Sequence, residues 1–184
     1  MRALLILATL LLAAGQAQAD VATCAALFRN APDALGGHRL TARTVYERKS
    51  PGSGYHLRYA RNDRQLASVF LYDRGRDTFS ERMLATELSV TTSQVFRMRA
   101  AGRNVTDGDV FFDRTKPARR GLFGIGFIHI EYDGRRLQHD FITLGPVDGC
   151  LVKLVYSSPG NRYFATRRFD RVLADLLGYV GQKR

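Results

Sequence analysis

The chain has 184 residues, of which 45% are hydrophobic and 24% are charged, and its formal net charge is +11. This length suits one domain with enough apolar residues to build a real core. The sequence contains no low-complexity segment, internal repeat or long linker, which excludes repeat architectures and domains joined by flexible tethers.

Residues 1–19 have the pattern of a secretory signal peptide. Arg2 precedes an apolar run over residues 3–14, and Ala17-Gln18-Ala19 matches an A-x-A cleavage site. The run is shorter than the roughly 20 residues that a membrane-spanning helix needs. We therefore expect cleavage after Ala19 and one mature domain at 20–184 that is periplasmic or secreted, with no transmembrane segment.

The chain has two cysteines, Cys24 and Cys150. In an oxidising compartment, two cysteines are most simply one disulfide, which predicts a bond between the N-terminal end of the domain and a distant strand. The spacing is not that of a C-x-x-C redox pair, and a metal site would need further soft ligands. We expect no metal and no cofactor.

The first half of the domain is expected to hold a short helix, three strands and a long helix. Turn-forming residues separate the three strand runs. The expected ranges are 21–29 for the short helix and 39–49, 55–60 and 65–72 for the strands. Thr78-Phe-Ser-Glu81 fits a capping box at the start of the long helix. Residues at helical spacing predict its buried face, which is Leu84, Leu88, Thr91, Val95 and Met98.

The second half is expected to hold four strands and a C-terminal helix. The strand ranges are 104–112, the two halves of a hairpin over 127–144, and 150–157. The last helix is expected at 163–180, because its apolar residues form a continuous stripe that can pack on the sheet.

The hairpin carries the densest set of residue types that acid–base or metal sites use. Asp133-Gly134 predicts a two-residue type I′ turn, which pairs Glu131 with Arg136 and places the two histidines on opposite faces. One face then carries His129, Glu131 and Asp140, and His139 lies on the other among aliphatic residues. We interpret the first face as solvated, with a polar ligand-binding face that uses Arg136 and Lys153 as the alternative, and we expect no metal there.

Basic side chains gather in two places along the sequence. The loop "DRTKPARRG" holds Arg114, Lys116, Arg119 and Arg120. The start of the last helix holds Arg162, Arg167, Arg168 and Arg171. Such clusters are usually solvated surface, but binding residues favour loops. If one group binds an anion or an acidic partner, we expect it to be the loop, with Arg136 as a further contact.

The sequence lacks the motifs of nucleophilic hydrolases, zinc proteases and P-loop proteins. We expect an exported, non-enzymatic binding or accessory protein of the bacterial cell envelope. Its partner would be an envelope protein, an anionic polymer or lipid headgroups, and not nucleic acid. Two alternatives stay open. One is a periplasmic carrier of a small amphiphilic or anionic ligand, and the other is a hydrolase that uses His129 with Glu131 or Asp140.

The order of elements resembles the PsbP-like α/β/α sandwich. The strand "VFLYD" before the long helix and "DFITLGPVDGCLVKLVYSSPG" before the last helix carry this resemblance, which is shared with uncharacterised secreted proteobacterial proteins. It implies an α+β fold, with a mainly antiparallel sheet packed by two long helices. It also implies an accessory role in a larger complex, and it transfers no catalytic residue.

Overall fold

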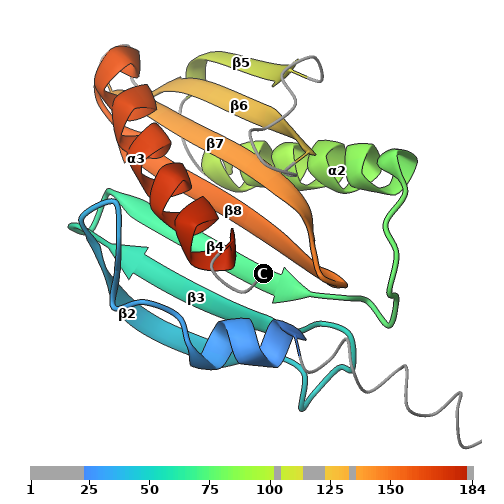
Figure 1. Cartoon of the computed structure of the whole chain (residues 1–184). Coiled ribbons are helices and arrows are strands. Elements are labelled where there is room, and N and C mark those ends of the chain that lie inside the picture. The colour runs from blue at the N-terminus through green and yellow to red at the C-terminus, as the bar shows by residue number, and fades with distance from the viewer. Residues whose placement is uncertain (1–22, 102–104, 114–122, 133–135, 182–184) are drawn as a thin grey trace, which may run out of the picture.

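One antiparallel sheet runs through the part of the chain that the structure describes. The computed structural model describes residues 23–101, 105–113, 123–132 and 136–181. The sheet has eight strands in the order β1-β2-β3-β4-β8-β7-β6-β5 (Figure 1). The strands are β1 Ala34–Leu35, β2 His38–Val45, β3 Tyr55–Ala60, β4 Leu66–Tyr72, β5 Val105–Asp113, β6 Phe123–Tyr132, β7 Arg136–Val147 and β8 Cys150–Pro159.

Helices cover both faces of this sheet. Helix α2, Glu81–Ala100, follows β4, crosses one face and leads to β5 at the sheet edge (Figure 1). Helix α3, Arg162–Gly181, follows β8 and packs on the other face, together with a short helix at residues 23–29. The predicted fold class is therefore confirmed: the protein is an α+β sandwich with an antiparallel sheet between helices.

The centre of the sheet is apolar on both faces. Strands β4 and β8 pair along their length. Val69 and Leu154 face each other and pack in the core beneath α3 and the short helix. Tyr72 and Leu151 pack in a second core beneath α2. Because apolar surface on both sides must leave water, the sheet needs a helical layer on each face.

The start of α2 and its buried face differ in detail from the sequence prediction. Ser80 is the N-cap, and its hydroxyl accepts a hydrogen bond from the Met83 amide at 3.4 Å. The predicted cap at Thr78 is therefore wrong by two residues. Met98 is 69% exposed, whereas Thr92 is buried. The buried face is therefore rotated toward Thr92 and Arg99, and Arg99 reaches Asp140 of the sheet from the last turn.

Gly126 of β6 lets α2 approach the sheet closely. The Thr92 side chain of α2 occupies the space in which a Cβ at position 126 would lie. The sequence does not reveal this contact, because the glycines before the hairpin are equally consistent with a flexible entry. A larger residue at this position would force the helix away from β6.

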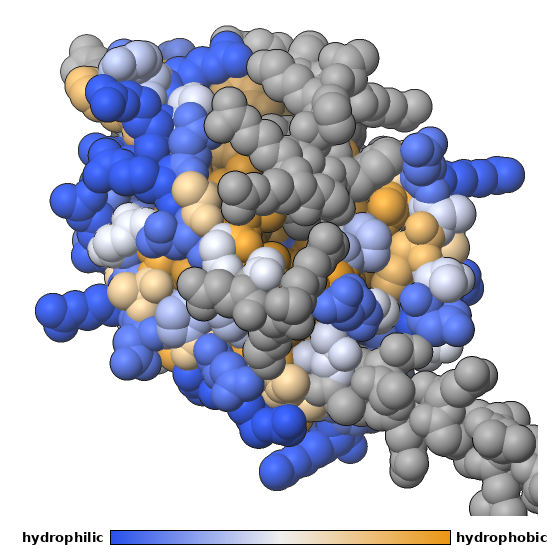
Figure 2. All heavy atoms as spheres, viewed as in Figure 1, coloured by the Kyte–Doolittle hydropathy of each residue, from blue (hydrophilic) through white to orange (hydrophobic). Residues whose placement is uncertain are grey.

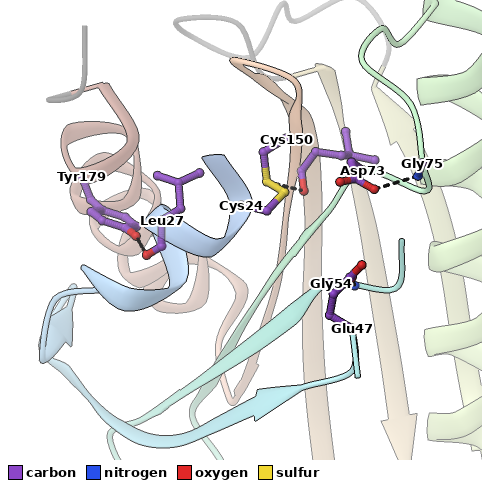
Figure 3. Close-up of a disulfide and its surroundings, with 9 residues drawn as sticks. Cys24, Leu27, Glu47, Gly54, Asp73, Gly75, Cys150 and Tyr179 are labelled. Atoms are coloured by element: carbon purple, nitrogen blue, oxygen red, sulfur yellow. Dashed lines mark hydrogen bonds between the residues drawn. A yellow bond between two sulfur atoms is a disulfide. The ribbon is translucent and has the colours of Figure 1, made fainter. Parts of the chain in front are cut away.

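The predicted disulfide is confirmed. Cys24 in the short helix is bonded to Cys150 at the start of β8, and both residues are buried (Figure 3). Close by, the Tyr179 hydroxyl of α3 donates a hydrogen bond to the Leu27 carbonyl oxygen. The short helix is thus held covalently to the sheet and by a hydrogen bond to α3.

We expect reduction of this disulfide to destabilise the protein. The bond joins residues that are 126 positions apart, and closing so long a loop contributes about 4–5 kcal/mol in the chain-entropy model. Urea unfolding with and without dithiothreitol measures the difference. The Cys24→Ser/Cys150→Ser variant should match the reduced protein and should not respond to the reductant. An unfolding midpoint that stays unchanged on reduction would contradict this account.

Candidate functional site

The register of the β6–β7 hairpin places its polar residues differently from the sequence prediction. Tyr132 pairs with Arg136, so residues 133–135 separate the last paired residues, and the Asp133-Gly134 turn itself lies outside the described residues. The predicted pairing of Glu131 with Arg136 is wrong, because Glu131 lies opposite Leu137. A shift of one position moves every side chain of one strand to the other face.

This shift brings the two histidines together. His129 pairs with His139 directly, and the two Nδ1 atoms are 3.3 Å apart. The prediction that they lie on opposite faces is therefore wrong. His139 is fully buried beside Phe127, and His129 is half-buried. His129, on the face interpreted as solvated, is half-buried, and His139 is buried as its expected aliphatic surroundings suggest.

Hydrogen-bond partners fix which nitrogen of each histidine carries hydrogen. His139 Nε2 lies 2.7 Å from the Gly160 carbonyl oxygen, which can only accept, so Nε2 is the protonated nitrogen. In neutral His139, Nδ1 is then an acceptor, and the hydrogen shared by the pair belongs to His129 Nδ1. The neutral pair therefore leaves the lone pair of His129 on Nε2.

Asp140 belongs to a different cluster on the opposite face of the sheet. It pairs with Ile128 and Ser157, and its side chain is fully buried under α2. Arg99 donates to both carboxylate oxygens, at 3.2 Å and 3.0 Å, and to the Ser157 hydroxyl at 2.6 Å. The Ser157 hydroxyl also donates to Asp140. This ion pair fastens the end of α2 to the sheet, and Asp140 cannot orient His129 for hydrolysis.

Lys153 is likewise engaged beneath α2. Its ammonium donates to Glu87 Oε1 at 2.9 Å and lies over the Tyr72 ring. Glu87 also accepts hydrogen bonds from the Tyr72 hydroxyl at 2.7 Å and from Arg74 at 2.6 Å. Burial would raise the pKa of Glu87, but the hydrogen bonds from Lys153 and Tyr72 outweigh it and lower that pKa. Lys153 therefore has a structural partner and is not available as the anion contact considered from sequence.

The predicted anion site cannot be placed. Its four loop residues, Arg114, Lys116, Arg119 and Arg120, lie outside the described residues, as does the predicted signal peptide. Arg136 lies in β7, opposite Tyr132. Within the described ranges, no group of three or more His, Cys, Asp or Glu side chains is arranged to hold a metal ion. No helix there is long and apolar enough to cross a bilayer.

The start of α3 presents aromatic and basic side chains together. Tyr163 and Phe164 are 60% and 55% exposed, and their rings meet edge to face. At about 100° per residue, these two rings and the exposed Arg167 and Arg171 fall on one face of α3, opposite its buried stripe. Arg167 lies over the Tyr163 ring. We call these four residues the α3 patch.

Figure 2 shows the same side of the molecule as atoms. Hydrophilic side chains gather around the start of α3, and hydrophobic atoms are exposed among them. Asp170 is an acidic neighbour on this part of the helix. The sequence revealed the arginines of this region, but the exposure of the two rings depends on how α3 is rotated against the sheet.

No protein-family model and no curated protein matches the chain. Among solved structures, the chain is similar to cyanobacterial PsbP (CyanoP) from Synechocystis sp. PCC 6803, whose structure was determined in solution. The two are 15% identical with a TM-score of 0.39, over 76% of this chain and 85% of that chain. At this identity and TM-score, the likeness concerns the arrangement of elements alone.

Replacing Asp140 should destabilise the fold strongly. Asp140→Ala leaves the Arg99 guanidinium without its buried carboxylate, and losing one partner of a buried ion pair costs about 3–5 kcal/mol. We expect about 3 kcal/mol, because the Arg99 side chain is 30% exposed. Urea unfolding measures this loss. Asp63→Ala, which removes an exposed carboxylate beside Arg64, is the control and should change little. Equal effects of the two substitutions would contradict the assignment.

Stability should fall when the solution is acidified through the range in which histidine titrates. Burial lowers the pKa of His139, and the Gly160 carbonyl only partly offsets this effect. Burial also lowers the pKa of His38 and of His56. The unfolded chain therefore binds more protons below about pH 6.5, so the free energy of unfolding decreases as the pH falls.

Urea unfolding at a series of pH values from about 7.5 to 5 measures this dependence. His139→Gln should reduce the slope of the free energy against pH, whatever it does to stability at neutral pH. A wild-type stability that rises on acidification across this range would disprove the explanation. The stability that Glu87 contributes is lost only at lower pH, since its lowered pKa lies below 4.5.

Proposed function

We propose that this protein is an exported, non-enzymatic binding or accessory module of the bacterial cell envelope that contacts an anionic lipid surface through the α3 patch. The proposal rests on one observation above all, the exposure of Tyr163 and Phe164 beside Arg167 and Arg171. The A-x-A site after an apolar run and the buried disulfide support export, because disulfides persist in oxidising compartments.

The chemistry of the α3 patch suits a membrane interface. Aromatic rings lie favourably at the level of lipid headgroups, where apolar surface meets water. Basic residues near an anionic leaflet contribute about 1 kcal/mol each. Arg167 and Arg171 make no ion pair among the described residues, so their charge is available to phosphate groups. Two arginines and two rings would give weak, salt-sensitive binding that needs no cleft.

Co-sedimentation with lipid vesicles tests the proposal. The mature protein should bind vesicles that contain phosphatidylglycerol more tightly than vesicles of phosphatidylcholine alone, and added salt should weaken the binding. Arg167→Gln/Arg171→Gln should weaken it by about thirtyfold, from about 1 kcal/mol for each arginine. Phe164→Ser should weaken it at every salt concentration, because the ring contributes through apolar burial.

Arg48→Gln/Lys49→Gln is the matched control. It removes the same charge from exposed residues of the β2–β3 connection and should leave vesicle binding unchanged. Binding that is equal on neutral and anionic vesicles, or that survives the arginine substitutions on α3, would refute this proposal. Binding to an envelope protein or an anionic polymer, with none to vesicles, would replace the lipid by that partner.

A further inference from the structure

A groove at the start of α2 lies apart from the α3 patch. It has a volume of about 360 Å³ and is formed by the segment from Arg74 to Glu87 together with Leu151 of β8. This size lies at the lower end of the range of small-molecule sites in proteins. The groove is separate from the β6–β7 hairpin, whose polar face is the alternative ligand-binding face expected from the sequence.

Three arginines line the groove, and two of them have no acidic partner in the described part of the chain. Arg74 Nη2 donates a hydrogen bond to Glu87 Oε2. Arg76 and Arg82 form no ion pair with any carboxylate that the structure describes. Glu87 is also bonded to Lys153. The groove therefore carries an excess of positive charge, and guanidinium groups suit carboxylate and phosphate oxygens.

The remainder of the lining is apolar. The half-buried side chains of Phe79 and Met83 lie in the groove, and Leu84 and Leu151 lie beneath them in the core. Arg76 is held close to this surface, because its Nη1 lies 3.4 Å from the Met83 sulfur. A ligand that fits both parts has an acidic group and an apolar chain.

We infer that this groove is a binding site for a small anionic amphiphile, whose carboxylate or phosphate contacts Arg76 and Arg82 while its apolar chain packs on Phe79 and Met83. This site goes beyond the proposed surface contact, since it lies on different elements and requires a single ligand molecule. Asp77 and Glu81 belong to the same segment but do not line the groove.

Titration of the isotope-labelled mature protein, followed by the chemical shifts of its backbone amides, tests the inference. Octanoate and octyl phosphate are the probes. Octanol, which has the apolar chain alone, and inorganic phosphate, which has the charged group alone, are the controls. Both amphiphiles should bind saturably and shift amides between Arg74 and Glu87. Octanol should bind at least about tenfold more weakly, because hydrogen bonds to a charged group contribute about one decade or more of affinity. Inorganic phosphate should also bind at least about tenfold more weakly, because it lacks the apolar chain, of which about two buried CH2 groups contribute one decade of affinity.

Arg76→Gln/Arg82→Gln should weaken octanoate binding at least about tenfold, while the amide spectrum remains that of the folded protein. Arg39→Gln/Arg58→Gln, which removes the same charge from exposed residues of β2 and β3, should leave it unchanged. Three results would overturn the inference: octanol that binds as tightly as octanoate, phosphate that does so, or shifts centred on α3. The vesicle experiment is independent, so either proposal can fail alone.

Discussion

The two-sided burial of β4 and β8 is the constraint on which the rest of the fold depends. Both strands lie at the centre of the sheet, and both have apolar residues on each face. A sheet of this kind is stable only if a layer covers each side. The chain supplies those layers by sending α2 across one face between β4 and β5, and α3 across the other after β8. Two buried ion pairs, Arg99 with Asp140 and Lys153 with Glu87, lie where α2 meets the sheet.

The order and type of the elements could be predicted because long periodic runs specify them. The apolar stripe of α3 and the β-rich run of β4 have no competing interpretation. The start of α2 was less well determined, because Thr78 and Ser80 are both good N-cap residues. Only packing decides between them.

The register of the hairpin could not be predicted, because a single residue decides it. The chain contains two Asp-Gly dipeptides between strands. Asp148-Gly149 closes a two-residue loop between Val147 and Cys150, and both of its residues have positive φ angles, as a type I′ turn requires. Around Asp133-Gly134, by contrast, three residues separate the paired Tyr132 and Arg136. The alternation of polar and apolar residues near the histidines does not reveal the register, because the adjacent His139 and Asp140 face opposite sides of the sheet and are both buried.

The burial of two carboxylates leaves the surface of the protein more positively charged. Asp140 and Glu87 are neutralised internally by Arg99 and Lys153, so these two acids do not offset the arginines that face solvent. The excess positive charge of the described residues therefore acts mainly at the surface, where it attracts anions over about one Debye length and weakens with added salt. The α3 patch and the groove at the start of α2 each add apolar surface to that charge.

The position of the disulfide has a consequence for biosynthesis. Cys24 is among the first residues of the domain, whereas Cys150 follows seven of the eight strands. During synthesis, the thiol of Cys24 has no partner within the chain until the polypeptide has been made past residue 150. A product that ends before this residue keeps a lone thiol, which other thiols or an oxidase can capture. The covalent bond therefore distinguishes nearly complete chains from prematurely terminated ones.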